Sequence, residues 1–315
     1  MGPAYGRRMD ETIEVRGLTK RYGDTVAVDD LTFSVLPGRV TGFVGPNGAG
    51  KSTTMRMILG LAAPDAGTAS VGGEPYVRKP FPLREVGALL DASDTHPSRR
   101  ARDHLRWLAE SNDIPRSRIT EVLELVGLAD VGGRRTGGFS LGMAQRLGIA
   151  AALLGDPPIL MLDEPVNGLD PEGIVWIRGF LRSLAAEGRT VFVSSHLMSE
   201  LQGTADHLVV IGRGRLIVDA SVEELLASAA NGAVVLRTPD RTEVMTVLAN
   251  AGATVVSTGA DALSVTGLGA ERIAGLVAEH RLRLLELTPH RATLEDVYLE
   301  LTRDAVEHAA TGGRG

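Results

Sequence analysis

The 315-residue sequence predicts an α/β protein that ends in a smaller α+β domain. Three observations lead to this fold class. A glycine-rich loop follows an apolar run and precedes a helical pattern. Later apolar runs end in polar or acidic residues. An alternation of short strands and helices then restarts after residue 228.

The composition is that of a globular protein, with 43% hydrophobic and 23% charged residues. The formal net charge of −6 argues against a general nucleic-acid binder, which needs a basic surplus to meet the phosphate backbone. The chain has no cysteine, which excludes disulfides and thiolate metal sites. Its longest apolar run, residues 147–154, is too short to span a bilayer. We expect residues 1–11 to form a disordered tail without a secretory signal, with Met9 as an alternative start.

The first elements are strands. Residues 12–16 have the alternation of a strand, and residues 18–22 lead from it to a turn. Residues 31–35 and 40–44 predict a hairpin that leads into the glycine-rich loop. Tyr22 is conspicuous because aromatic residues make up only 4% of the chain. It is a candidate for stacking on a nucleotide base, whereas a buried or loop-anchoring tyrosine is the simpler alternative.

The glycine-rich loop at residues 45–52 follows the pattern G-x-x-x-x-G-K-[ST], between the strand at 40–44 and a helix predicted over 53–61. Its glycines let backbone N–H groups point inward, and the helix N-terminus adds positive potential, so the loop is suited to cradle phosphates. We expect Lys51 to reach the terminal phosphates and the Ser52 hydroxyl to ligate Mg²⁺. The residues expected to bind nucleotide here are Gly45, Asn47, Gly48, Gly50, Lys51, Ser52 and Thr53. The alternative is a turn that matches the pattern by chance.

A strand predicted over residues 86–90 ends on the carboxylate of Asp91. Residues 93–155 then lose strand character and show helical spacing, which predicts an inserted helical subdomain. Its first helix is expected over residues 103–112, with Trp107 on the apolar face.

The last helix of this subdomain has a distinctive start. Ser140 is a candidate N-cap for a helix that runs to residue 154, and glycines lie on both sides of it. A hydroxyl, glycines and a helix N-terminus together form a second anion-binding surface. An ordinary capped helix accounts for the same residues.

Two further runs end in groups suited to catalysis. The apolar run 158–162 predicts a buried strand, and Asp163 and Glu164 follow it directly. Because ligands bind at the carboxyl edge of parallel sheets, Asp163 is suited to holding Mg²⁺ through water and Glu164 to polarising an attacking water. A buried strand over 190–196 brings His196 to the same edge, where it is placed to donate a hydrogen bond to a γ-phosphate. A solvated turn for the acids and a structural histidine are the alternatives.

The C-terminal pattern follows a hairpin predicted over 207–219 and reads β-α-β-β-α-β. Its elements are expected at residues 233–237, 242–251, 254–257, 262–265, 270–280 and 282–287. A last helix over 293–302 and a flexible tail over 304–315 complete the chain. The predicted C-terminal α+β accessory domain, residues 229–303, holds no catalytic cluster.

Taken in order, these motifs resemble the nucleotide-binding subunits of ABC transporters, with coverage from about Ile13 to Ala227. In this resemblance, Tyr22 is the base-stacking aromatic, Lys51 and Ser52 belong to Walker A, and Ser140 to Met143 form the signature. Asp163 and Glu164 belong to Walker B, Asp170 to the D-loop, and His196 is the switch histidine. Ser140, Gly142 and Asp170 are thereby expected to contact nucleotide. One departure is Asp91, which stands where the family has the Q-loop glutamine. Its carboxylate is a further candidate for holding Mg²⁺.

The resemblance implies a P-loop NTPase fold with an ABC ATPase core at residues 12–228, comprising an antiparallel β subdomain and the inserted helical subdomain at 93–155. It implies ATP and Mg²⁺ as ligands. It also implies a homodimer in which each ATP lies between the Walker A loop of one subunit and the Ser140 segment of the other. The partner is a separately encoded integral membrane permease. The chain would be cytoplasmic and peripheral at the inner face of the cell membrane.

The S-L-G-M signature and the ending at residues 292–302 are similar to ATPases of drug and antibiotic exporters, so we expect export of a drug, antibiotic or other small hydrophobic compound. The first alternative is a soluble ABC-type ATPase that acts on ribosomes or nucleic acid. Such proteins carry two cassettes or a long coiled-coil insertion, which this chain lacks. A non-catalytic regulatory binder is the second alternative, and the complete set of Lys51, Asp163, Glu164 and His196 argues against it.

Overall fold

The computed structural model describes residues 11–91, 95–229, 233–289 and 293–298. The chain divides into two compact units, Met1–Val222 and Glu223–Gly315. Helix α8 (Val222–Ala229) lies at this division, and the domain boundary predicted at residue 228 falls within it. Within the described segments, no helix combines the length and apolar composition that a membrane span requires.

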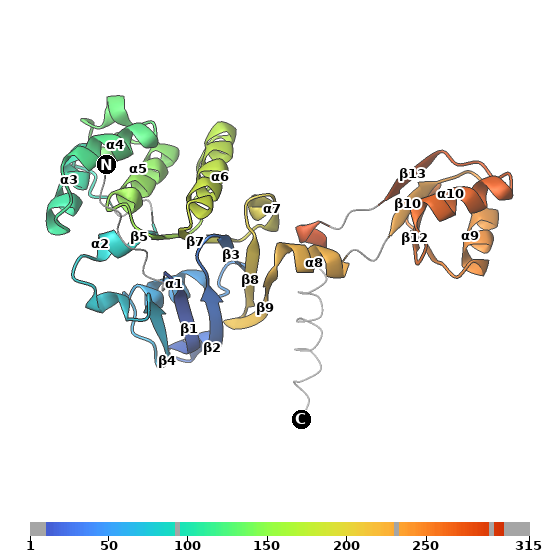
Figure 1. The fold of residues 1–315 in the computed structure, drawn as a ribbon, viewed down its shortest axis with the longest axis horizontal. Helices are drawn as coiled ribbons and strands as arrows, with labels where there is room; N and C mark the ends of the chain where they lie inside the picture. The colour runs from blue at the N-terminus through green and yellow to red at the C-terminus, as the bar shows by residue number, and fades with distance from the viewer. Residues whose placement is uncertain (1–10, 92–94, 230–232, 290–292, 299–315) are drawn as a thin grey trace. The chain divides into compact units, whose positions relative to one another are not determined.

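The first unit is organised around a six-stranded sheet in the order β5-β6-β7-β3-β8-β9. Figure 1 shows β3, β8 and β9 of this sheet side by side. The strands are β3 (Val40–Val44), β5 (Val86–Leu89), β6 (Ile159–Leu162), β7 (Thr190–Ser195), β8 (His207–Gly212) and β9 (Arg215–Ser221). All neighbours are parallel except β8 and β9, which form the predicted hairpin. Every residue of β3, β6 and β7 is buried, as continuous apolar runs in a parallel sheet require. The carboxyl ends of these three strands therefore meet at one edge of the sheet.

A second, antiparallel sheet has the order β2-β1-β4, with β1 (Ile13–Tyr22), β2 (Thr25–Val35) and β4 (Ala66–Val71). The hairpin predicted between residues 31–35 and 40–44 is wrong, because Leu31 of β2 pairs with Leu18 of β1 while β3 enters the parallel sheet. The physical reason is burial, since β3 has no solvent-facing residue and needs cover on both faces. Phe33, Phe43 and Phe192 fill the space between the sheets, with ring centroids 5.2 to 5.7 Å apart.

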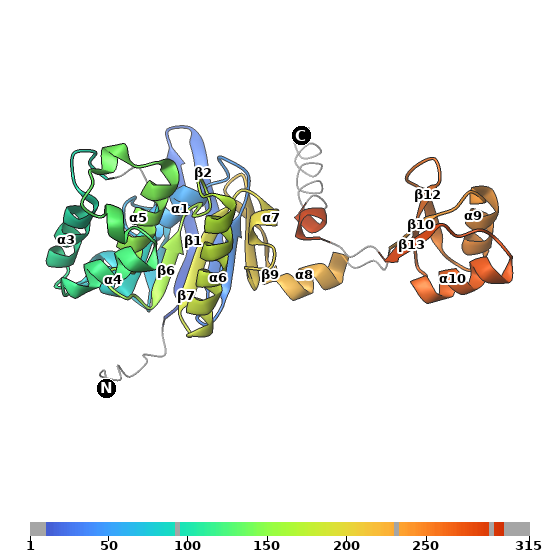
Figure 2. The same ribbon diagram turned by 90° about the horizontal axis from the view of Figure 1, so that it is seen from above.

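Helices cover and extend the central sheet. Helix α1 (Lys51–Ile58) follows β3, and α6 (Pro171–Ala186) packs against β7. Between β5 and β6 in the sequence lie α3 (Ala101–Ser111), α4 (Ser117–Leu125) and α5 (Leu141–Leu153). These three helices cluster together (Figure 2), and α5 packs against β5. Short elements complete the unit: α2 (Pro82–Glu85), α7 (Met198–Leu201) and the 3₁₀ turns η1 (Tyr76–Arg78), η2 (Ala129–Val131) and η3 (Thr136–Gly138).

Trp107 corrects one expectation about this helical segment. The buried face of α3 consists of Ala101, Leu105 and Ala109, whereas Trp107 is 56% exposed. Its ring instead lies against the guanidinium of Arg99, whose Cζ is 5.2 Å from the ring centroid. Small residues let α3 approach its neighbours closely, and the bulky indole is accommodated outside this contact.

The second unit has the predicted β-α-β-β-α-β order. Its elements are β10 (Val234–Arg237), α9 (Arg241–Asn250), β11 (Thr254–Ser257), β12 (Ala262–Thr266), α10 (Ala270–Glu279) and β13 (Glu286–Pro289). The strands form an antiparallel sheet in the order β11-β12-β10-β13. The last strand begins later than predicted, because Leu282 and Leu284 pack on the core from an irregular segment before it.

The remaining predictions concern the ends of the chain. Residues 294–298 are helical, in agreement with the start of the predicted last helix. The rest of that helix, residues 1–10 of the predicted N-terminal tail, and the tail at 304–315 lie outside the described residues. The main-chain carbonyl of Glu11, the last residue of the predicted N-terminal tail, accepts a hydrogen bond from the Thr190 hydroxyl.

Candidate active site

The glycine-rich loop joins β3 to α1 and is shaped by close packing of its glycines. Gly50 has φ +104°, and a Cβ atom there would lie 2.5 Å from the carbonyl oxygen of Ala27. A Cβ at Gly45 would lie 2.4 Å from the carbonyl oxygen of Ile211. Both positions therefore require glycine. Asn47 and Gly48 are exposed at the loop surface, where a ligand would reach their backbone N–H groups.

Lys51 is the first residue of α1, so the helix begins two residues before the predicted start and includes Ser52 and Thr53 in its first turn. The Lys51 side chain is only 6% exposed. Its Nζ donates to the carbonyl oxygen of Gly45 at 2.6 Å and lies 3.5 Å from Oε1 of Glu164. The ammonium group is therefore held across the loop at the edge of the sheet.

Asp163 follows β6 and receives hydrogen bonds on both carboxylate oxygens. The Ser52 hydroxyl donates to Oδ2 at 2.6 Å, and the Ser194 hydroxyl donates to Oδ1. The Asp163 side chain is 9% exposed. Ser52 and Asp163, which were each predicted to hold Mg²⁺, are thus direct neighbours, and their oxygen atoms form a donor set suited to a hard divalent cation.

Glu164 has a backbone φ of +50°, which is uncommon for a residue with a Cβ atom. Its Oε2 is 2.8 Å from Nδ1 of His196, which follows β7. Its main chain is held on both sides: the Glu164 N–H donates to the Ser194 hydroxyl at 2.9 Å, and Nε2 of Gln145 donates to the Glu164 carbonyl at 3.2 Å. Glu164 therefore presents its carboxylate between Lys51 and His196.

Ser194 and Gln145 are contacts that the sequence prediction did not identify. Ser194 lies one residue before the end of β7, next to β6, and the register pairs Leu162 with Val193. In the sequence, only the presence of a polar serine near the end of an otherwise apolar strand indicates that Ser194 faces Asp163. Gln145 carries no such signal, because its partner is a main-chain carbonyl distant in the sequence.

Tyr22 and Asp91 are both exposed. Tyr22 is the last residue of β1, and Nζ of Lys20 lies 5.5 Å from the centroid of its ring. Because Tyr22 is 54% exposed, the alternative of a buried tyrosine is wrong. The Lys20 ammonium and the Arg21 N–H both donate hydrogen bonds to the Asp65 carboxylate. These bonds lower the pKa of Asp65, and the bond from Arg21 has the largest effect.

Asp91 lies just beyond β5, next to the undescribed residues 92–94. Its role stays a prediction.

Ser140, Gly142 and Asp170 lie at two helix N-termini. The Ser140 hydroxyl caps α5 by accepting from the Met143 N–H at 3.2 Å. Asp170 caps α6 by accepting from the Gly173 N–H at 2.9 Å. In the described part of the chain, no hydrogen bond or ion pair joins these three residues to Lys51, Glu164 or His196.

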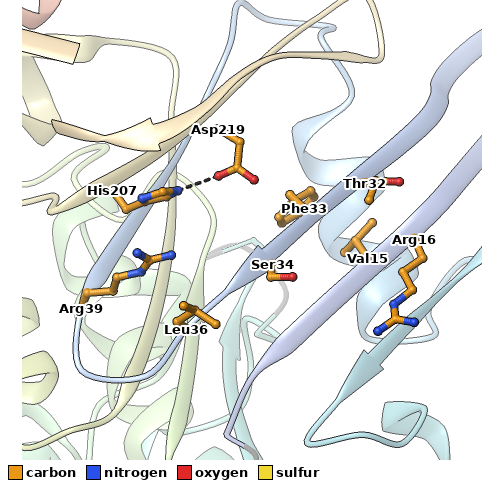
Figure 3. Close-up of a pocket in the computed structure, with 9 residues that line it drawn as sticks. All are labelled: Val15, Arg16, Thr32, Phe33, Ser34, Leu36, Arg39, His207 and Asp219. Atoms are coloured by element: carbon orange, nitrogen blue, oxygen red, sulfur yellow. Dashed lines mark hydrogen bonds and ion pairs between the residues drawn. The ribbon is translucent and has the colours of Figure 1, made fainter. Parts of the chain in front are cut away.

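A separate cavity of about 470 Å³ lies elsewhere in the first unit (Figure 3). His207, whose Nε2 is 2.6 Å from Oδ1 of Asp219, lines it together with Arg39. Arg39 precedes β3 and His207 begins β8, so the cavity is at the amino edge of the sheet. None of the predicted site residues lines it.

The catalytic candidates thus gather at the carboxyl edge of β3, β6 and β7, around a phosphate-binding loop. Such an edge is typical of phosphate-loop nucleotidases. Residues 28–167 match the family described as ABC transporter, and residues 232–295 match a domain of unknown function.

Known proteins resemble the chain over most of its length. The bacitracin transport ATP-binding protein BcrA of Bacillus licheniformis is 43% identical over 220 residues, which cover 69% of this chain and 72% of that protein. The ABC transporter ATP-binding protein YhcH of Bacillus subtilis is 34% identical over 312 residues, 96% of this chain and 100% of that protein. A solved structure of an ATP-binding subunit of an ABC transporter has a TM-score of 0.63 at 27% identity, covering 69% of this chain and 92% of that one.

The chain belongs to the ATP-binding subunits of ABC transporters, which confirms the resemblance and the fold class predicted from the sequence. It is an ATP-hydrolysing subunit of a transporter. The relatives favour this function over the alternative of an ABC-type ATPase that acts on ribosomes or nucleic acid.

Proposed function

We propose that this chain hydrolyses ATP at the edge formed by β3, β6 and β7, with Glu164 as the residue that orients and polarises the attacking water. The observation that carries the proposal is the position of the Glu164 carboxylate, 3.5 Å from Lys51 Nζ and 2.8 Å from His196 Nδ1. In this arrangement Lys51 neutralises phosphate charge and His196 holds the γ-phosphate. Asn47, Thr53 and the loop glycines supply backbone donors to the phosphates.

Ser52 and Asp163 are the residues that would hold Mg²⁺. Their side-chain oxygens are 2.6 Å apart, and Ser194 orients the remaining Asp163 oxygen. This oxygen donor set fits a hard cation, which would neutralise charge on the β- and γ-phosphates. Asp91 is a further candidate from the end of β5. A comparison of ATPase kinetics between Asp91→Gln and the parent tests this role of Asp91. If the two proteins hydrolyse ATP equally, both in the absence and in the presence of the membrane partner, Asp91 has no role in hydrolysis or in its coupling to transport.

The second part of the proposal is a homodimer with two shared sites. Ser140 lies at the exposed N-terminus of α5 and is not joined to the phosphate loop of its own chain. Its hydroxyl, the first N–H groups of α5 and Gly142 form a surface that accepts the phosphates of ATP bound to a second subunit. Asp170 lies at the start of α6 beside this surface, since a Cβ at Gly142 would lie 2.7 Å from the carbonyl oxygen of Gly168. Tyr22 supplies an exposed ring on which the adenine stacks.

The third part concerns the partner and the cargo. We propose that the chain binds an integral membrane permease from the cytoplasmic side, peripheral to the inner face of the cell membrane, with helices α3 to α5 as the docking surface. The exposed Trp107 on α3 supports this choice, because aromatic residues anchor protein interfaces. We propose that the cargo is exported, and the relative named for bacitracin transport supports an antibiotic, a drug or another small hydrophobic compound as that cargo.

Glu164→Gln tests the catalytic assignment. The variant keeps the size and hydrogen-bonding capacity of the side chain but removes its negative charge, so we expect kcat to fall about 100- to 10,000-fold. ATP affinity should persist, and light scattering should show an ATP-dependent dimer. Glu172→Gln, an exposed acid in the first turn of α6, is the control and should hydrolyse ATP normally. Hydrolysis by Glu164→Gln at the parental rate would refute the role of Glu164.

Co-purification tests the partner. The chain is expressed with the neighbouring reading frames and isolated in detergent, and we expect a polytopic membrane protein to be recovered with it. Recovery of ribosomes or nucleic acid in its place would contradict the transporter assignment.

A further inference from the structure

Three metal-ligating side chains converge beside the catalytic edge. Glu164 follows β6, His196 follows β7, and Glu200 lies in α7. Each offers one ligand atom, and these atoms all lie within 4.8 Å of one another. The ATPase mechanism proposed above uses Glu164 and His196 but leaves Glu200 without a role. The convergence of an imidazole with two carboxylates is therefore unexplained by hydrolysis alone.

Glu200 is held in place by its neighbours. The Ser195 hydroxyl donates to Oε2 of Glu200 and accepts from the Leu197 N–H at 3.0 Å. Ser195 is the last residue of β7 and is 1% exposed, so it fixes this contact to the buried sheet. A hydrogen bond that orients a carboxylate ligand is a typical outer-shell feature of metal sites. His196 Nδ1 is already 2.8 Å from Oε2 of Glu164.

We propose that Glu164, His196 and Glu200 form a binding site for a transition-metal ion of the Zn²⁺ class. One imidazole and two carboxylates provide three protein ligands and leave a fourth position open. Bonds of about 2.0 to 2.2 Å place neighbouring ligand atoms roughly 3.3 Å apart. The three side chains are partly buried, and their ligand atoms lie no more than 4.8 Å apart, close to the spacing that such an ion requires. Mg²⁺ is not the intended occupant, because it prefers oxygen ligands and six-coordinate geometry.

The local charge permits such an ion. Lys51 is a cation that faces the site, with Nζ 3.5 Å from Oε1 of Glu164. Its ammonium group also donates to the carbonyl oxygens of Gly45 at 2.6 Å and Pro46 at 3.5 Å, which take up part of its charge. The two carboxylates balance the charge of a divalent ion. This ligand set shares no residue with Ser52 and Asp163, where Mg²⁺ is proposed.

The site also implies a mode of inhibition, which rests on the proposed function. An ion bound there takes the Glu164 carboxylate away from water and the His196 imidazole away from the γ-phosphate. Lys51, the loop glycines and Asp163 remain available to ATP. We therefore expect micromolar Zn²⁺ to lower kcat while the KM for MgATP stays within about twofold.

The binding test uses the untagged full chain without nucleotide and Co²⁺ as the spectroscopic probe. The expected result is a visible absorption spectrum of four- or five-coordinate Co²⁺ that titrates to one equivalent and is displaced by Zn²⁺. Glu200→Gln should weaken Co²⁺ binding at least tenfold, because it removes a charged ligand. Glu200→Asp, which keeps the charge on a shorter side chain, should bind with intermediate affinity. If Glu200→Gln folds poorly, the Co²⁺ affinity of Glu200→Asp provides a second test of the site.

His207→Ala is the matched control. His207 is also paired with a carboxylate, Asp219, at 2.6 Å (Figure 3), but among the described residues this pair belongs to no three-ligand cluster. The control should bind Co²⁺ like the parent. Parental affinity in both Glu200 variants, or loss of binding in His207→Ala, would overturn the proposed site. Binding at the site without inhibition of hydrolysis would leave the metal site standing and refute the catalytic roles of Glu164 and His196.

Discussion

At the scale of single residues, Gln145 connects two parts of the proposed mechanism. It lies on α5, whose N-terminus carries Ser140, and its Nε2 donates to the carbonyl of Glu164 at 3.2 Å. Gln145 is 4% exposed, and Glu164 has the left-handed φ of +50°. Such a backbone conformation costs about 1 to 3 kcal/mol and persists only when neighbouring groups hold it. Gln145 is thus a positioning residue that acts through Glu164.

We predict that Gln145→Ala lowers kcat for ATP hydrolysis about 10- to 100-fold, because the Glu164 carboxylate loses its fixed position. ATP affinity, measured by fluorescence titration, should change less than about twofold. Gln202→Ala is the control, since Gln202 is an exposed glutamine beyond α7. A lower melting temperature with an unchanged kcat would show that Gln145 has only a structural role.

How far the site could be predicted depends on the sequence distance between partners. Lys51 and Ser52 belong to one short motif, and the spacing of its residues predicts where their side chains lie. Their positions at the loop could therefore be predicted from the sequence alone. Asp163, Glu164 and His196 needed one further step, that buried parallel strands end at a common edge. Gln145 was not predictable, because side-chain donation to a main-chain carbonyl leaves no pattern in composition or spacing.

At the scale of elements, the errors arose where local pattern and tertiary packing favour different arrangements. Residues 31–35 and 40–44 have the composition of two short strands that are close in sequence, which predicts a hairpin. Burial on both faces of β3 instead places it in the parallel sheet. The hydrophobicity of Trp107 predicts a place on the apolar face of α3, whereas Leu105 and two alanines form the buried face of this helix. Burial against non-local neighbours decided both cases.

The exposed ring of Trp107 leads to a prediction about docking. We expect Trp107→Ala to weaken co-purification of the membrane partner about tenfold or more, because buried aromatic anchors dominate interface energetics. The ATPase activity of the isolated chain should stay unchanged. Val175→Ala on α6, where Val175 is 71% exposed, is the control for loss of an exposed apolar side chain. Equal recovery of the partner with both variants would place the docking surface elsewhere.

His104, also on α3, predicts a pH dependence of stability. Burial, with a smaller effect of the Arg99 charge, lowers the pKa of His104 below its ordinary value of 6.5, and its Nδ1 is buried without a hydrogen-bond partner. Because the folded pKa lies below the unfolded one, the unfolded chain binds more protons as the pH falls through 6.5. The free energy of unfolding of the first unit should therefore decrease from pH 7.5 toward pH 5.5.

His104→Gln should reduce this pH dependence, since glutamine does not titrate. The free energy of unfolding of the first unit is measured at each pH by urea titration, with tryptophan fluorescence as the signal. This signal reports on the first unit because both tryptophans of the chain, Trp107 and Trp176, lie there. His280→Gln in the second unit is the control and should keep the parental slope. An identical slope in His104→Gln would assign the pH dependence to other groups.

At the scale of the whole molecule, the chain joins a catalytic unit to a second unit with a core of its own. The order of elements in the second unit was predictable because each short strand and helix is bounded by turn residues. Its sheet order, β11-β12-β10-β13, was not, because pairing between distant strands is set by packing. Leu236, Leu248 and Leu263 are all fully buried in this core.

Separate cores predict that the second unit can be destabilised without loss of catalysis. Leu236→Ala removes a fully buried side chain from β10 and should lower the stability of the second unit by about 2 to 5 kcal/mol. Hydrogen exchange should then accelerate in residues 234–289, while protection at β3, β6 and β7 and the rate of ATP hydrolysis stay at parental levels. Leu285→Ala, where Leu285 is 64% exposed, is the matched control and should leave exchange unchanged. If Leu236→Ala also accelerates exchange at β6 and slows hydrolysis, the two units unfold together, and the catalytic edge depends on the C-terminal core for its stability.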